Sequence, residues 1–432
     1  MLGDRPAPAL TGCQNRGVSA LTWVFFGLSV GGAVFTANGL RPLAHGLFGV
    51  PVFFAGWLTT ELAPHNLAVV ALGTIGFAAG GAVHGWPGWV GLALDLLSVV
   101  GLLLLIRQSD RARDVIDAAL VAGLGERYAS PLLDRPVPDD LRVPWRQLTI
   151  PFRPKQPHVT KHRDVRYADG AGKRHLLDVY HRDDTPRGAP VLLQVHGGGW
   201  VIGTKDQQGL PLMNHLAARG WVCVAPNYRL APKTKMCGMV SDVEAALAWT
   251  REHIAEYGGD PTNIVITGGS AGGHLCSLVA LRNVDVITAC VAFYGVYDIC
   301  ADTGHKECIR TRDDMLGRFI IEGTYKDDPE LFASYSPIRQ VRADAPPFFV
   351  IHGRHDTLVP VDEARLLVER LRAVTRSPLV YAELPGTQHG FEVFPSVRTA
   401  HVIRGVERFL AATVGRASGE GVAAPGSTLA SS

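Results

Sequence analysis

A serine inside a glycine-rich stretch is the first residue in this sequence whose type and setting suggest chemistry. Ser270 lies at the centre of a Gly-x-Ser-x-Gly pattern that runs from Gly268 to Gly272. An apolar run, Asn263 to Thr267, precedes the pattern, and a stretch with helical spacing follows it. In a sharp turn between a strand and a helix, glycines avoid clashes and the serine hydroxyl is exposed above the sheet. We therefore predict Ser270 as a nucleophile, with Gly268 and Gly272 supporting the turn.

A serine hydroxyl needs a base within hydrogen-bond reach, and that base must be oriented by an acid. For a nucleophile in this kind of turn, the order along the chain is serine, then acid, then histidine. Asp356 and His389 follow predicted strands in that order, so we predict them as the acid and the base. Asp298 and Asp362 are rival acids, although Asp362 stands where it would cap a predicted helix.

Acyl transfer also requires N–H groups that stabilise the oxyanion of the tetrahedral intermediate, each worth roughly 3 to 4 kcal/mol of the barrier. A predicted strand leads into the segment His196 to Trp200, whose three glycines let the backbone approach a substrate closely. We predict the N–H groups of Gly198, Gly199 and Ala271 as the donors. Gly197 supports the same loop and remains a possible donor.

Several conspicuous side chains near these motifs have a simpler interpretation. We expect His196 to hold the glycine loop rather than act as a second base, and His274 to pack on the helix after the serine rather than bind a metal. For Trp200, Phe391 and Phe394, core packing and a place in an acyl or alcohol pocket are equally compatible with the sequence.

The elements that must position these residues alternate between short β-branched runs and helical patterns from Val165 onward. This alternation predicts an α/β fold with a mostly parallel sheet covered by helices on both faces, whose sites lie beyond the carboxyl ends of the strands. The predicted strands are His175 to Tyr180, Val191 to His196, Trp221 to Ala225, Asn263 to Thr267, Thr288 to Phe293, Pro347 to His352 and Leu379 to Leu384. The predicted helices are Ser241 to Tyr257, Ala271 to Leu281, Asp362 to Val374 and Val397 to Val414.

Five segments in this order resemble the α/β-hydrolase esterases of the hormone-sensitive lipase and carboxylesterase type, and also the prenylcysteine methylesterases. They are His196 to Trp200, Asn227 to Pro232, Gly268 to Gly273, Asp356, and His389 to Phe391. The resemblance covers roughly Val165 to Val414 and implies an α/β-hydrolase fold, carboxylic-ester hydrolysis and no cofactor. The chain departs from the hormone-sensitive group at Gly269, where that group usually has an acid, and in the turn that holds Asp356.

The first 106 residues have a different composition. They contain only six charged side chains, whereas the whole chain has 42 Lys and Arg and 40 Asp and Glu. A membrane-spanning helix needs about 20 mostly apolar residues. The apolar runs predict about four spans, at 18 to 39, 43 to 60, 66 to 83 and 89 to 106. A cleaved signal peptide would explain only the first run. Buried core helices of a soluble fold would leave this part with almost no polar surface to face water.

The predicted domains are therefore a transmembrane helical region (1–106), an amphipathic and proline-rich linker (107–160), an α/β-hydrolase domain (161–415) and a disordered tail (416–432). An even number of spans would keep both ends of the chain in the cytoplasm, and we expect a multi-pass protein of a bacterial plasma membrane. The near-neutral charge argues against nucleic-acid binding. Seven cysteines without a C-x-x-C pair argue against a zinc site and a disulfide framework.

These observations predict a membrane-anchored serine esterase that acts on short or medium acyl esters or on lipid-derived esters, with the bilayer as its other partner. The same residues would also serve an amide or formamide hydrolase. A non-catalytic interaction protein on this fold is the remaining alternative, which the presence of all three predicted catalytic residues and the glycine loop disfavours.

Overall fold

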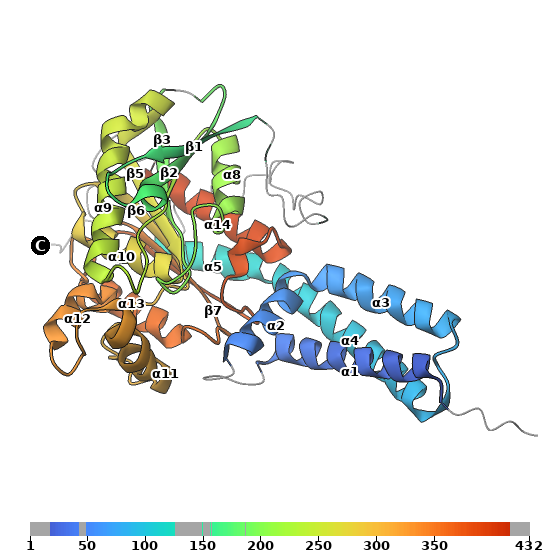
Figure 1. Cartoon of the computed structure of the whole chain (residues 1–432). Coiled ribbons are helices and arrows are strands. Elements are labelled where there is room, and N and C mark those ends of the chain that lie inside the picture. Colours follow the sequence, from blue (N-terminus) through green and yellow to red (C-terminus); the bar gives the residue numbers. More distant parts are fainter. Residues whose placement is uncertain are drawn as a thin grey trace, which may run out of the picture.

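The computed structural model of the chain describes residues 18–42, 49–125, 149, 156, 158–185 and 187–414. An elongated group of apolar helices projects from a larger part in which helices surround a twisted sheet (Figure 1). The predicted tail and most of the proline-rich segment fall outside the described residues, as does the start of the predicted second span.

One eight-stranded sheet organises the larger part, with the strand order β1-β2-β4-β3-β5-β6-β7-β8. β1 and β2, and β2 and β4, pair antiparallel, and every other neighbouring pair is parallel. The strands are β1 (Val159–Arg166), β2 (Leu176–Arg182), β3 (Ala189–Val195), β4 (Val222–Pro226), β5 (Gly259–Gly269), β6 (Ile287–Phe293), β7 (Phe348–Gly353) and β8 (Leu379–Leu384).

Helices cover both faces of this sheet. They are α5 (Ala112–Leu124), α8 (Leu210–Ala218), α9 (Met236–His253), α10 (Ala271–Arg282), α11 (Lys306–Arg310), α12 (Pro329–Tyr335), α13 (Val361–Val374) and α14 (Val397–Thr413). Short 3-10 segments lie at Gly172–His175, Ile254–Tyr257, Pro337–Arg339 and Phe391–Val393, and a π-helix lies at Thr311–Ile320.

Two apolar cores lie on opposite faces of the sheet, because side chains along a strand alternate between its faces. Val191 and Leu193 of β3 join the core beneath α9, α10 and α13. Leu192, between them, joins the core beneath α5, α8 and α14. Strands buried on both sides account for the continuous apolar runs in the sequence.

All seven predicted strands are present, and the mostly parallel sheet confirms the predicted fold class. The strand that the sequence did not reveal is β1, Val159–Arg166. It lies at the edge of the sheet and has a charged sequence with exposed positions, so it lacks the apolar pattern on which the prediction relied.

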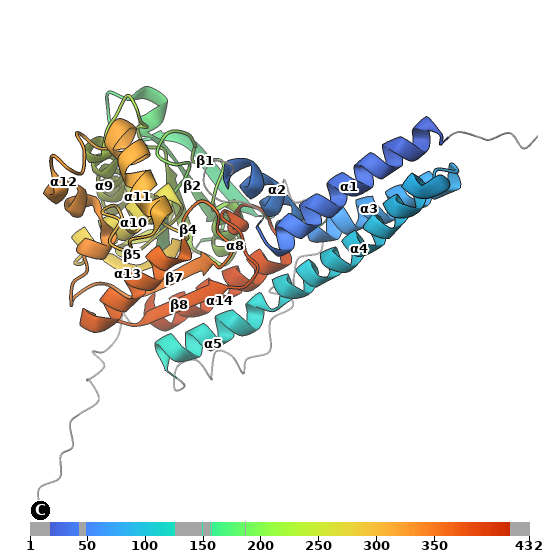
Figure 2. The same ribbon diagram turned by 90° about the horizontal axis from the view of Figure 1, so that it is seen from below.

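The described residues of the apolar N-terminal part form four helices, α1 (Ala20–Leu40), α2 (Gly49–Glu61), α3 (Ala63–Ala79) and α4 (Gly85–Asp110). α1, α3 and α4 lie side by side and extend away from the sheet, whereas α2 lies at the junction between the two parts (Figures 1 and 2). α1 and α4 run in the same direction, because Phe25 lies beside Gly91 and Thr36 lies beside Gly101. Small residues permit such close helix approach within a bilayer.

The predicted count of four spans is not confirmed. By length and apolarity, two helical stretches are able to cross a membrane, Ala20–Leu40 and Gly85–Leu124. α2 has 13 residues, so at about 1.5 Å per residue it is too short for a hydrocarbon core of about 30 Å. α2 and α3 meet at an angle of 85°, and counting this bent pair as one span gives at most three spans among the described residues.

The first half of the predicted linker is helical. α5 is amphipathic, as the sequence predicts, and Ile116 and Leu120 contribute to the core beneath α14. Asp117 of α5 also accepts a hydrogen bond from Arg408 of α14 at 2.8 Å. α5 therefore packs as part of the sheet-containing domain, directly after α4.

Candidate active site

Ser270 occupies the sharp turn between β5 and α10. Its backbone has φ 59° and ψ −123°, a combination that residues with side chains rarely adopt. A Cβ atom at Gly272 would lie 2.2 Å from the carbonyl oxygen of Val195, and one at Gly268 would lie 2.4 Å from that of Gly272. The two glycines thus allow the turn to sit against β3, and Ser270 is held above the carboxyl ends of the strands.

Asp356 and His389 come together from the loops after β7 and β8. The Nδ1–H group of His389 donates to Oδ2 of Asp356 at 2.6 Å, and both side chains are buried. The other carboxylate oxygen, Oδ1, accepts the N–H groups of Leu358 at 2.9 Å and Val359 at 2.8 Å. Such an arrangement fixes the tautomer of the imidazole and leaves its Nε2 atom free to act as a base.

Asp356 stays ionised although it is buried. Burial by itself raises the pKa of a carboxyl group, but the charge of His389 and hydrogen bonds from His352 and His389 outweigh it and hold the pKa of Asp356 well below its usual range. His352 contributes through its Nε2 atom, which lies 3.3 Å from Oδ2 of Asp356.

The two rival acids are engaged elsewhere. The carboxylate of Asp298 accepts the N–H groups of Asp302 and Thr303, each at 2.8 Å. Asp362 lies in the first turn of α13 and pairs with Arg365 at 2.9 Å. Of the three candidate acids, Asp356 is the one that contacts His389.

Tyr294 contacts both the serine turn and the histidine. Its ring centroid lies 4.5 Å from that of His389, and its hydroxyl oxygen lies 2.6 Å from the position of a Cβ atom built on Gly269. The hydroxyl donates to the buried carboxylate of Glu392. Burial raises the pKa of Tyr294 and of Glu392. Tyr294 therefore lies against both His389 and Gly269, the residue before Ser270.

Within the part of the chain that the structure describes, no hydrogen bond joins Oγ of Ser270 to Nε2 of His389. Catalytic hydrogen bonds are often long in the absence of substrate and shorten in the reactive complex. The structure thus brings the predicted acid and base into contact, and Tyr294 lies against both His389 and Gly269, the residue before Ser270.

The glycine loop after β3 also has the backbone that the sequence suggests. Gly198 has φ 115° and Gly199 has φ 58°. The N–H group of Gly197 donates to Oε1 of Gln208 at 2.6 Å, so it is already occupied. Over the described residues, the N–H groups of Gly198, Gly199 and Ala271 have no protein acceptor. Unoccupied donors of this kind suit an oxyanion site.

The histidines interpreted as structural are buried within hydrogen-bonded packing. The ring of His196 stacks on Tyr228 at 4.3 Å, and the Tyr228 hydroxyl donates to the His196 carbonyl at 2.9 Å. His274 contacts the carbonyl of Tyr335 at 2.8 Å and receives the indole N–H of Trp200 at 3.3 Å. Burial lowers the pKa of both His196 and His274 to about 4, so both are neutral near pH 7.

Sequence reasoning missed a glutamine that joins the acid loop to the base loop. Oε1 of Gln388 accepts the N–H groups of Thr357 at 2.8 Å and of His389 at 3.0 Å. Only the fold brings residue 357 beside residue 388, so the sequence carried no signal beyond the adjacency of Gln388 and His389.

Helix α2 also packs against the histidine loop, which the sequence did not predict. The indole N–H of Trp57 donates to the carbonyl oxygen of Gly390 at 2.8 Å, and the ring of Phe53 lies 5.9 Å from that of His389 in an edge-on arrangement. Trp57 also stacks on Phe394 at 4.7 Å. Phe53 and Trp57 occur in an apolar run with the composition of a membrane span, so nothing in the sequence indicated their contact with the site.

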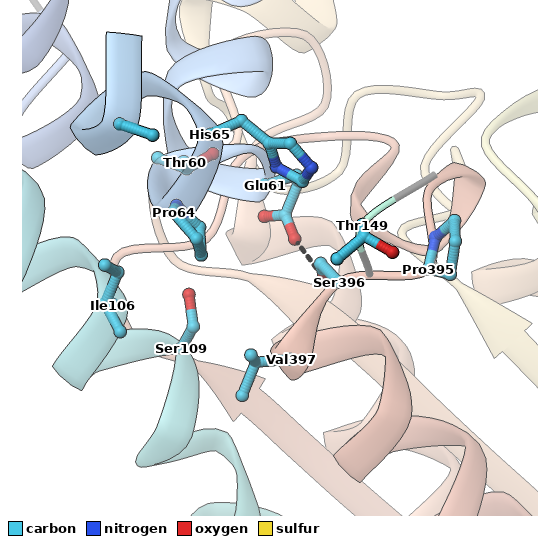
Figure 3. A pocket seen from close by; sticks show the side chains of 11 residues that line it. Thr60, Glu61, Pro64, His65, Ile106, Ser109, Thr149, Pro395, Ser396 and Val397 are labelled. Atoms are coloured by element: carbon cyan, nitrogen blue, oxygen red, sulfur yellow. Dashed lines mark hydrogen bonds between the residues drawn. The ribbon is translucent and has the colours of Figure 1, made fainter. Parts of the chain in front are cut away.

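A buried ion pair fixes the other end of α2. Glu61 accepts a hydrogen bond from Arg398. Figure 3 shows that it also accepts one from the hydroxyl of Ser396, at 2.7 Å. A cavity of about 210 Å³ lies beside this pair, between the α2–α3 corner, α4 and the start of α14. It is lined by Thr60, Glu61, Pro64, His65, Ala68, Ile106, Ser109, Thr149, Pro395, Ser396 and Val397.

Comparison with known proteins agrees with this site. The BD-FAE family matches residues 177–371. LipM of Mycobacterium tuberculosis, a probable carboxylic ester hydrolase, is 40% identical over an alignment of 402 residues that covers 88% of this chain and 90% of LipM. The chain belongs to this family of carboxylic ester hydrolases. Esterase LipQ of the same organism is 37% identical, and the match covers 72% of this chain and 77% of LipQ.

The esterase family extends to solved structures. Esterase B of Lactobacillus rhamnosis superposes with a TM-score of 0.50 and 20% identity, and the match covers 69% of this chain and 96% of that one. At this identity the likeness supports the α/β-hydrolase fold alone. The predicted membership of the carboxylesterases is confirmed.

Proposed function

We propose that this carboxylic ester hydrolase acts through a Ser270–His389–Asp356 triad. Ser270 Oγ attacks the carbonyl carbon of the ester while Nε2 of His389 takes its proton. The tetrahedral intermediate then collapses, the bond to the alcohol oxygen breaks, the alcohol leaves with the proton that His389 returns, and the acyl group remains bound to Oγ of Ser270. Water, activated by the same histidine, attacks the acyl-enzyme, and the carboxylic acid is released.

The N–H groups of Gly198, Gly199 and Ala271 would stabilise the negative charge on the intermediate. Support comes from the position of these donors around the serine turn and from the absence of an acceptor for them among the described residues. Each such donor contributes roughly 3 to 4 kcal/mol to lowering a barrier of this type.

The observation that carries the proposal is the 2.6 Å contact between His389 and Asp356, and the strained turn that holds Ser270 at φ 59° supports it. The test is labelling of the full-length chain with a fluorophosphonate, followed by assays on p-nitrophenyl esters and on aryl formamides. We expect Ser270 to be labelled, and we expect the Ser270→Ala variant to lose both labelling and ester turnover. A folded protein that turns over esters without Ser270 would contradict the proposal.

The helical part is proposed to anchor the enzyme through three spans, α1, α3 and α4, with α2 at the membrane surface. Because α1 and α4 run in the same direction, three spans place the start of α1 and the catalytic domain on opposite sides of the membrane. This arrangement differs from the even number expected from the sequence. Arg41, Arg107, Arg111 and Arg113 lie at the domain end, and only Arg5 and Arg16 precede α1, which favours a cytoplasmic catalytic domain.

The boundary between the two parts is proposed to lie near Asp110 instead of within a linker. α4 ends there, and α5 already contributes to the core of the catalytic domain. Protease accessibility of the catalytic domain in intact cells tests its side of the membrane.

A further inference from the structure

Helix α2 has two faces of different character. Its buried face includes Phe53 and Gly56. Its outer face is apolar and exposed at Val50 (54%), Phe54 (50%) and Leu58 (41%). These three residues are four positions apart and therefore form one stripe along the helix. An exposed apolar stripe of this kind is unfavourable in water and suits a helix that lies in the membrane interface.

The buried face of α2 rests on the base of the proposed triad. Phe53 packs edge-on against His389, and Trp57 donates to the carbonyl of the next residue, Gly390. Gly56 lies against Gln388, since a Cβ atom there would come within 3.6 Å of its side-chain nitrogen. The contact thus involves three consecutive residues of the histidine loop.

The outer face of α2 continues the apolar surface of the anchoring helices. α1 reaches α2 through a hydrogen bond from the Asn38 side chain to the carbonyl of Val52 at 2.8 Å. α3 leaves the end of α2 at 85°, and its outward residues Val69 and Leu72 are each 70% exposed. When Val69 and Leu72 contact the hydrocarbon core of the bilayer, the apolar stripe of α2 lies at the boundary of that core.

An α-helix with its side chains is about 10 to 12 Å thick. With lipid on one face of α2 and His389 on the other, the proposed catalytic base lies about one helix thickness from the bilayer. Exposed apolar side chains also flank the oxyanion loop, where Ile202 is 68% exposed directly after Val201. The carbonyl oxygen of Ile202 lies against Gly198. Exposed apolar side chains thus occur next to the oxyanion loop as well as on the outer face of α2.

We propose that α2 forms the membrane-side wall of the active site and that the enzyme takes its ester from the bilayer. The substrate class is then a membrane-resident lipid ester, whose acyl chain passes along Val50, Phe54 and Leu58 while its carbonyl group reaches Ser270. This inference rests on the proposed triad and adds to it the source of the substrate.

The test compares two esters of one alcohol with the full-length chain in phosphatidylcholine vesicles. 4-Methylumbelliferyl oleate partitions into the bilayer, and 4-methylumbelliferyl acetate stays largely in water. The double variant Phe54→Gln/Leu58→Gln should lower the oleate-to-acetate ratio of kcat/KM by about tenfold, since polar side chains on the path weaken binding of an apolar chain. The matched double variant Val69→Gln/Leu72→Gln on α3 should leave the ratio unchanged.

Fluorophosphonate labelling of Ser270 in each variant shows that the site is folded. An unchanged ratio in the labelled α2 variant, or an equal fall in the α3 variant, would overturn the inference. Turnover of acetate without turnover of oleate by the unmodified enzyme would also overturn it and leave the esterase mechanism intact. Failure on both esters, with Ser270 unlabelled, would instead count against the proposed function.

Discussion

Glu61 at the end of α2 and Arg398 in the first turn of α14 form an ion pair that is fully buried, although 337 positions separate them in the chain. The pair joins the apolar helices to the element that follows the histidine loop. α2 is thus fixed at Glu61 by charge and at Trp57 by a hydrogen bond to Gly390. The helical part and the catalytic part are therefore mechanically connected next to the proposed base.

Removal of one partner of this ion pair should destabilise the protein strongly. We expect Glu61→Gln and Arg398→Met each to lower the free energy of unfolding by about 3 to 5 kcal/mol, because each leaves a buried charge without its partner. The double variant should lose less than the two single losses combined. Urea unfolding in detergent micelles measures the free energy of unfolding of each variant. Arg354→Met, which breaks an exposed pair with Glu383, is the control and should cost under about 1 kcal/mol.

Asp356→Asn should lower kcat by about 10³- to 10⁴-fold with little change in KM, because an amide no longer holds the proton on Nδ1 of His389. Stopped-flow or steady-state assays on p-nitrophenyl esters measure the effect. Asp362→Asn changes a nearby exposed acid that does not contact His389 and should retain full activity. If the two variants were equally active, Asp356 would not be the acid of the triad.

Trp57→Phe removes the indole N–H that binds the Gly390 carbonyl and keeps an aromatic ring against Phe394. A hydrogen bond of this kind is worth about 0.5 to 1.5 kcal/mol, so we expect kcat to fall roughly 3- to 10-fold. Trp89→Phe, on an outward-facing residue of α4, is the matched control.

Glu363 should make stability depend on pH. Its carboxylate is buried, and Oε2 accepts the N–H groups of Tyr297 at 2.7 Å and Asp298 at 2.9 Å. Burial, together with the charge of Asp298, raises its pKa from the ordinary 4.5 to about 8. Between these values the folded protein holds a proton that the unfolded chain releases. The contribution of the protonated Glu363 to the free energy of unfolding is therefore complete below pH 4.5 and is lost as the pH rises through 8.

Across that window the free energy of unfolding should fall by about 1.4 kcal/mol per pH unit from this group. Glu363→Gln cannot ionise, so it should show a flatter dependence in urea unfolding measured from pH 5 to 9. Asp362→Asn, at the neighbouring exposed position, should keep the slope of the unmodified protein. Equal slopes in the unmodified protein and Glu363→Gln would contradict the assignment.

The sequence determined the elements whose pattern is local. Alternation of β-branched runs with helical spacing located seven of the eight strands, and Gly268 to Gly272 marked the turn at Ser270, because a turn that lacks room for side chains restricts residue type directly. The parallel arrangement then limited the acid and the base to loops after strands, which led to Asp356 and His389. β1 escaped prediction because an exposed edge strand needs no apolar period.

The sequence favoured Asp356 over Asp298 and Asp362, but only the tertiary structure shows that Asp356 contacts His389. The tertiary structure also determined where α2 packs. The run from Gly49 to Glu61 has the composition of a membrane span. An apolar composition indicates that a helix is shielded from water, but it does not show whether lipid or protein shields it. Its length and the 85° bend at α3 turn it across the junction, where Phe53 and Trp57 meet the histidine loop. Contacts between residues more than 300 positions apart depend on the packing of two separate parts of the chain, and no local pattern records them.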